Sequence, residues 1–79
     1  MMTIKEEAEF NKNLAKGLKS FRESQQIKQI EFSEKFSINQ TILSKIENGK
    51  IKLSAFMLYK LETWYGIGAT ELVQLGLDN

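Results

Sequence analysis

The chain has 79 residues, of which 42% are apolar, with no cysteine, no histidine and a net charge of +1. This length predicts one small domain, residues 1–79, because a chain of this size buries only about 60% of its unfolded surface. The missing cysteine and histidine exclude disulfides and the usual zinc sites. No apolar run approaches the roughly 18 residues of a membrane span. The first ten residues are acidic, where a signal peptide would be basic. We therefore expect a cytoplasmic protein without a membrane partner.

The charges are distributed unevenly along the chain. Residues 1–10 and residues 53–79 each carry a net charge of −2, because each has one lysine and three acids. Residues 11–52 carry nine lysines or arginines against four glutamates, a net charge of +5. A basic segment between less basic ends is typical of a surface that binds a polyanion.

The first helix is predicted to start at a capping box, in which Thr3 precedes Glu6 by three residues, and to continue to about Gln25. Its apolar residues recur at spacings of four, four and three: Phe10, Leu14, Leu18 and Phe21. Gly17 lies inside this helix. We expect it to weaken the helix by up to about 1 kcal/mol relative to alanine.

The second helix is predicted over residues 29–36, with Ile30 or Phe32 in the core together with the last residue. A tight joint follows it. Asn39 is a good N-cap for a third helix, because its side-chain oxygen can accept a hydrogen bond from a free N–H of the first turn. Gly49 is predicted to end that helix as a left-handed residue.

The fourth helix is predicted to start after the N-cap Ser54, and it carries apolar residues at helical spacing. Gly66 and Gly68 bracket a turn. A short fifth helix should follow over residues 69–75. Proline is absent and no segment alternates as a strand does, so the sequence predicts an all-α helical bundle.

The predicted third helix has two different faces. Leu43 and Ile46 fall on one side, at about 100° per residue, with Ile42 at the margin. The opposite side carries amides, hydroxyls, one lysine and no acid: Gln40, Thr41, Ser44, Lys45 and Asn48. A solvated face usually mixes glutamate with lysine. Side chains of the kind found here can instead bond to the base edges in a DNA groove. Ile42 could complete the core or meet a thymine methyl.

The segment FRESQQIKQIEFSEKFSINQTILSKIENGK, residues 21–50, resembles the helix-turn-helix core of the phage-repressor-like family, also called XRE or Cro-like regulators. The resemblance extends over about residues 18–73. It implies a compact five-helix bundle of lambda-repressor-like type, whose second and third helices form the helix-turn-helix. Several positions depart from the family pattern, among them Leu53 in place of a common proline, and Glu62 and Trp64 in place of small residues. Lys28 replaces a capping serine or threonine, Ser33 a small alanine, and Ser37 the turn glycine.

The resemblance also implies roles for particular residues of this chain. Those at the base edges would be Gln40, Thr41, Ser44 and Lys45. Those at the DNA phosphates would be Gln29, Asn48, Lys50 and Lys52. Arg22 and Glu47 correspond to a structural ion pair between the first and third helices. We interpret this pair as structural rather than functional.

A dimer is expected, because small helix-turn-helix proteins commonly bind two half-sites about one DNA turn apart. The C-terminal third is rich in bulky apolar residues, and its candidate dimer contacts are Trp64, Leu72, Leu75 and Leu77. The acidic extension, residues 1–10, is the other candidate for this contact.

The leading hypothesis for function is a stand-alone, sequence-specific repressor that binds a palindromic operator in double-stranded DNA. The alternative is an antitoxin, which would bind a toxin and regulate its own operon. We do not expect an enzyme, because the chain lacks histidine and cysteine and has one aspartate, Asp78. We also expect no cofactor, metal or small-molecule ligand.

Overall fold

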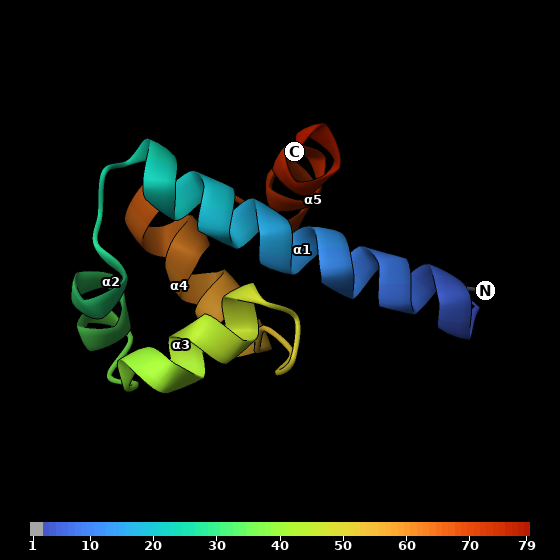
Figure 1. Ribbon diagram of the computed structural model, residues 1–79. Helices are drawn as coiled ribbons and strands as arrows, with labels where there is room; N and C mark the ends of the chain where they lie inside the picture. The colour runs from blue at the N-terminus through green and yellow to red at the C-terminus, as the bar shows by residue number, and fades with distance from the viewer. Residues whose placement is uncertain (1–2) are drawn as a thin grey trace.

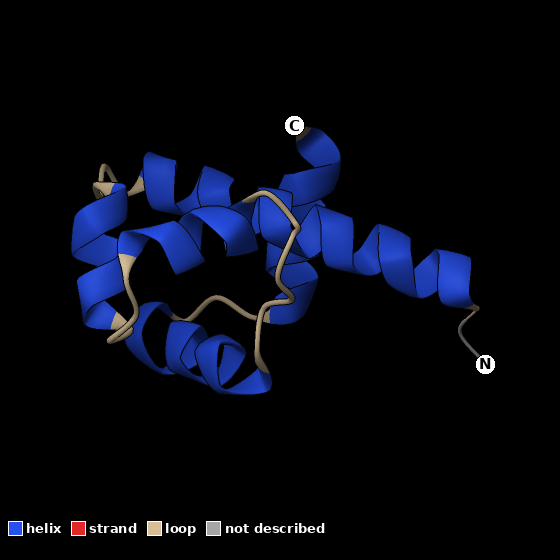
Figure 2. Ribbon diagram, turned by 60° about the horizontal axis from the view of Figure 1, so that its bottom comes forward, coloured by secondary structure: helices blue, strands red, loops and turns tan. Residues whose placement is uncertain are grey.

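The computed structural model describes residues 3–79, and these residues form helices joined by short loops, without strands (Figures 1 and 2). The helices are α1 (Ile4–Ser24), α2 (Gln29–Lys35), α3 (Gln40–Glu47), α4 (Ala55–Tyr65) and α5 (Ala69–Asp78). The predicted all-α class and the order of five helices are confirmed. Met1 and Met2, which belong to the predicted acidic extension, lie outside the described residues. No helix in the described part of the chain is long and apolar enough to cross a bilayer.

The N-terminal turns of α1 extend beyond the rest of the bundle (Figure 1). The predicted capping box is present. The hydroxyl of Thr3 accepts a hydrogen bond from the N–H of Glu6 at 3.0 Å, and the N–H of Thr3 donates to the Glu6 carboxylate at 3.4 Å. Ile4 is 90% exposed. The first turns are therefore stabilised by local hydrogen bonds rather than by burial.

Local signals set the ends of α2 and α3. The Asn39 side chain accepts from the N–H of Ile42 at 2.8 Å, as an N-cap should. Gly49, just after α3, has a φ of 77°, which confirms the predicted left-handed residue. Lys28 offers no side-chain cap, and its N–H donates to the Glu31 carboxylate at 3.3 Å instead. The helix-turn-helix thus has one strong cap and one weaker start.

Ser33 and Ser37, which stand where the family favours alanine and glycine, each find a local solution. Ser33 is buried, and its hydroxyl donates to the carbonyl of Ile30 at 2.7 Å, so this buried hydroxyl has a partner. Ser37 has a φ of 58°, in the left-handed region that costs a residue with a side chain about 1–2 kcal/mol. Gln26, in the α1–α2 joint, has the same φ of 58°.

One core joins all five helices. Its buried apolar residues are Leu14, Leu18, Phe21, Phe32, Leu43, Ile46, Met57, Leu61, Ile67 and Leu72. Of the two alternatives in α2, Phe32 is the core residue, and Ile30 is 50% exposed. The Phe32 ring packs edge-on against Phe36, with centroids 5.1 Å apart. Because α2 has only two turns, it can direct one large side chain fully inward.

Helix α5 is longer than predicted. Helix α5 continues to Asp78, not to Leu75, because Gly76 does not end it. Instead Gly76 lies against the backbone of Asn13, where a Cβ atom would overlap the carbonyl oxygen. Gly17 of α1 meets the backbone of Leu72 in the same way. Gly17 is therefore a site of close helix approach, a role that its weak helix propensity does not reveal.

Candidate nucleic-acid interface

Helix α3 presents the residues predicted to contact DNA bases on its outer face. Gln40, Thr41 and Lys45 are exposed, and Ser44 is partly buried. The opposite face is buried in the core, as the two-sided pattern predicts. Ile42 is partly buried and packs against the core. Of the two alternatives for this residue, the structure therefore shows packing at the edge of the core.

A shallow hollow lies over the outer face of α3. It is lined by Gln29, Gln40, Thr41, Ser44, Lys45, Asn48 and Lys50. All seven are among the eight residues that the resemblance assigns to DNA. Lys50 joins the others because the chain turns back after Gly49, so that its N–H donates to the carbonyl of Lys45 at 2.8 Å. The eighth residue, Lys52, lines a neighbouring groove beside α1.

A buried ion pair supports this hollow from below. The Arg22 guanidinium binds Glu47 through two N–H groups, at 2.7 Å and 3.1 Å, and donates a third hydrogen bond to the carbonyl of Ile27 at 2.9 Å. Both side chains are buried. The hydrogen bonds to Glu47 raise the pKa of Arg22 above its ordinary value, against the opposing effect of burial. The pair ties α1 to the last turn of α3.

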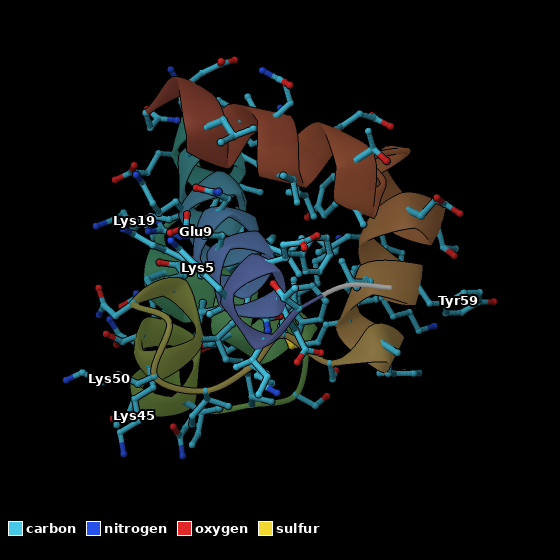
Figure 3. All side chains as sticks on the ribbon, turned by 90° about the vertical axis from the view of Figure 1, so that its right-hand side faces the viewer. Lys5, Glu9, Lys19, Lys45, Lys50 and Tyr59 are labelled. Atoms are coloured by element: carbon cyan, nitrogen blue, oxygen red, sulfur yellow. The ribbon has the colours of Figure 1, made fainter. Side chains whose placement is uncertain are left out.

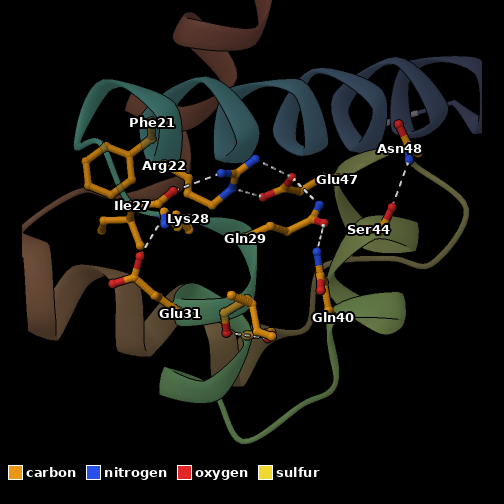
Figure 4. Close-up of polar contacts among 12 residues, drawn as sticks. Phe21, Arg22, Ile27, Lys28, Gln29, Glu31, Gln40, Ser44, Glu47 and Asn48 are labelled. Atoms are coloured by element: carbon orange, nitrogen blue, oxygen red, sulfur yellow. Dashed lines mark hydrogen bonds and ion pairs between the residues drawn. The ribbon is translucent and has the colours of Figure 1, made fainter.

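The ion pair continues into the outer face of α3 through two amides (Figure 4). The Gln29 side-chain N–H donates to Glu47 at 3.1 Å, and its oxygen accepts from the side chain of Gln40 at 3.2 Å. A chain of hydrogen bonds thus connects Arg22, Glu47, Gln29 and Gln40. The sequence did not reveal the Gln29–Gln40 link, because no spacing rule relates residues on two different helices.

Comparison with known proteins decides the family. A profile of the helix-turn-helix family matches residues 18–72, most of the chain. The protein belongs to the phage-repressor-like helix-turn-helix family. No curated protein and no solved structure gives a match.

Membership in this helix-turn-helix family makes the chain a DNA-binding regulatory domain. The match runs from the last two turns of α1 into the first turn of α5, so it includes both helices of the motif and the ion pair beneath them. The family is typically not enzymatic.

Three lysines of this helix-turn-helix domain lie on one side of the molecule. Lys19, Lys45 and Lys50 extend toward the same side of the molecule, and Tyr59 extends toward the opposite side (Figure 3). The side with the lysines includes the outer face of α3. A duplex that approaches α3 would therefore meet a positive surface.

The four candidate dimer contacts are not equivalent in the structure. Leu72 has no exposed surface and belongs to the core beneath α1, so it has no side-chain surface to offer a second copy. Leu75 is partly buried against the core. Leu77 is 59% exposed and Trp64 is 37% exposed. These two carry the apolar surface that a dimer contact through the C-terminal third would use.

Proposed function

We propose that the protein is a sequence-specific regulator, a repressor in its simplest form, that inserts α3 into the major groove of a palindromic operator. The main support is the hollow over α3, where seven polar or basic residues come together without a single acid. A polar surface without acids suits a polyanion whose base edges carry both donors and acceptors.

Gln40 is proposed as the principal base reader, because the network positions its amide. One of its two N–H donors is used in the bond to Gln29. The other N–H and the oxygen remain available, and together they match the N7 acceptor and N6 donor of adenine. Lys45 would donate to a guanine, and Thr41 would meet a thymine methyl or a base acceptor. Ser44 would add a further contact.

Phosphate contacts at both edges of the hollow would orient the protein on the duplex. Asn48, Lys50 and Lys52 follow α3 and are exposed. On the other edge, Gln29 retains one N–H beyond the one given to Glu47. Such contacts position a protein without reading sequence. We expect them to contribute to affinity on every duplex.

A dimer is proposed for the palindrome, with the exposed Leu77 and Trp64 of the C-terminal third at the contact. Sedimentation velocity of the protein with and without a selected duplex would test this. Leu77→Glu should weaken the dimer, and Leu72 should be of no use for such a test because its substitution would disrupt the core. A wild-type protein that binds its preferred duplex as a monomer would contradict the dimer.

The decisive experiment is an unbiased selection of duplex DNA by the wild type and by Gln40→Ala combined with Lys45→Ala. We expect the wild type to enrich an inverted repeat, and the double variant to lose that preference while it retains salt-sensitive binding. Gln74→Ala with Lys60→Ala is a matched control, because it removes the same two groups from α5 and α4. Failure of the wild type to enrich any motif would overturn the proposal.

An antitoxin is the second candidate, and one feature supports a protein partner. Phe56 and Tyr59 of α4 are 63% and 62% exposed, and the Lys60 ammonium lies 5.6 Å and 5.8 Å from their ring centroids. Exposed aromatic side chains that cluster are typical of interaction surfaces. Copurification of a neighbouring-gene product with the wild type, and its loss with Phe56→Ser and Tyr59→Ser, would favour this function.

A further inference from the structure

We propose that the middle of α1 forms a second DNA-binding surface, which contacts the sugar–phosphate backbone beside the segment that α3 reads. The surface is a groove between α1, the α3–α4 loop and the last residue, here called the α1 groove. Its basic residues are Lys12, Lys16, Lys19 and Lys52. The proposal rests on the proposed function in that its ligand is duplex DNA.

The α1 groove continues the α3 hollow rather than forming a separate site. Asn48 lines both of them, and Gly49 and Lys52 lead from one to the other along the loop. In Figure 3, Lys19 extends to the same side as Lys45 and Lys50. A duplex seated on α3 would therefore lie next to the row of lysines on α1.

The net charge of the α1 groove is positive. All four lysines are exposed. Two carboxylates line the groove, Glu23 and Glu47, and Glu47 is neutralised by Arg22. That ion pair is the only one within residues 3–79, so none of the lysines has a carboxylate partner there.

The spacing of the lysines argues for a ligand. Lys12, Lys16 and Lys19 follow one another at intervals of four and three, which places them on one stripe of α1. Like charges at these intervals repel each other and destabilise a helix, and Glu9 and Glu23, at the two ends of the stripe, offset part of this repulsion. A polyanion bound along the stripe would remove this repulsion.

The shape of the stripe favours a nucleic-acid backbone over a small anion. Seven residues of helix span on the order of 10 Å, a length over which one DNA strand advances by about three phosphates. Small-molecule sites enclose their ligand, whereas these side chains are long and exposed. Lys16 donates to the backbone oxygen of Asn79 at 3.1 Å and retains two further donors.

The test compares the salt dependence of DNA affinity in the wild type and in Lys12→Gln with Lys19→Gln. These two lysines make no hydrogen bond to other groups within residues 3–79, so the variant should fold normally, as circular dichroism would verify. Because each phosphate contact contributes about 0.9 to the slope of log K against log salt, the variant should lower the slope by about 2. We expect at least a tenfold loss of affinity on a duplex that extends beyond the α3 site.

Two control variants separate a contact from a general charge effect. Lys35→Gln with Lys60→Gln removes the same charge from α2 and α4 and should leave the slope nearly unchanged. Lys12→Arg with Lys19→Arg should retain the wild-type slope. Equal slopes for the wild type and the Lys12–Lys19 glutamine variant, or an equal fall in the Lys35–Lys60 control, would overturn the proposal.

Random-sequence duplex of the same length keeps this test separate from the proposed function. Phosphate contacts do not depend on sequence, so the same difference in slope is expected there. If the wild type shows no preference for a selected duplex, the operator proposal fails. The slopes measured on random duplex would still show whether the α1 groove contacts DNA.

Discussion

Helices α2 and α3 are joined to α1 by hydrogen-bonded side chains, whereas α1 and α5 approach each other most closely at two residues that have no side chain. In the first region, Arg22 reaches Glu47 across the interface, and Gln29 and Gln40 continue the hydrogen bonds to the surface. In the second, Gly17 and Gly76 allow two backbones to touch.

The difference matters because the two regions transmit changes differently. The hydrogen-bonded network connects the core to a side chain on the proposed reading surface, so a change at its buried end should alter both stability and binding. The glycine crossing, where Gly17 and Gly76 lie between α1 and α5, is a contact of backbones with a side-chain hydrogen bond from Asn79 to Ser20 at 2.9 Å beside it, and it lies on the far side of α1 from α3 (Figure 1). Its substitution should change stability and leave the DNA preference of the folded fraction intact.

The largest expected effect comes from the buried end of the network. Arg22→Ala should lower the free energy of unfolding by about 3–5 kcal/mol, because Glu47 would remain buried without its partner. Urea denaturation monitored by circular dichroism would measure it. Arg22→Met with Glu47→Leu should recover much of the loss. A loss of less than about 1 kcal/mol in the single variant would show that the pair is open to solvent.

The next effect tests the glycine crossing. Gly76→Ala should destabilise the protein by about 3 kcal/mol, the upper part of the range for overpacking, because the new Cβ overlaps the Asn13 carbonyl and the helices must separate. Thermal denaturation would detect this, and Thr70→Ala, at an exposed position of α5, should be near neutral. A stabilised Gly76→Ala protein would mean that α5 does not approach α1 this closely.

A smaller effect tests whether the network positions Gln40. Gln29→Ala should weaken binding to the preferred duplex roughly tenfold, because the Gln40 amide loses its fixed partner and the proposed phosphate contact of Gln29 is lost. In a double-mutant cycle that combines Gln29→Ala with Gln40→Ala, the two losses of binding free energy should be strongly non-additive. Titration by fluorescence anisotropy would measure the DNA affinity of the wild type, the two single variants and the double variant. Additive losses would show that the two glutamines act independently.

The smallest effect concerns the joint between α2 and α3. Ser37→Gly should raise the free energy of unfolding by about 1 kcal/mol, because glycine adopts a positive φ without strain. Ser37→Ala, which retains the strain, is the matched control and should not stabilise the protein. Denaturation midpoints of the two variants would settle the sign. The DNA preference of both should equal that of the wild type.

Much of the fold and the reading face could be predicted because the signals are local. The capping box at Thr3, the cap at Asn39 and the left-handed Gly49 depend on residues at most a turn apart. The polar face of α3 follows from helical periodicity alone. The length of α5 was predicted wrongly, and the close approach of α1 and α5 at Gly17 and Gly76 could not be predicted, because both depend on how two distant segments meet.

The sequence by itself determined the order of the five helices, the caps at Thr3 and Asn39 and the side of α3 that remains polar, since hydrogen bonds and periodicity within one helix are encoded in neighbouring residues. Only the tertiary structure decided that Gln29 bridges Glu47 and Gln40, that two glycines lie between helix backbones, and that four lysines share one groove. These features join residues far apart in the chain, and their distances follow from how the helices pack around the common core rather than from any spacing along the sequence.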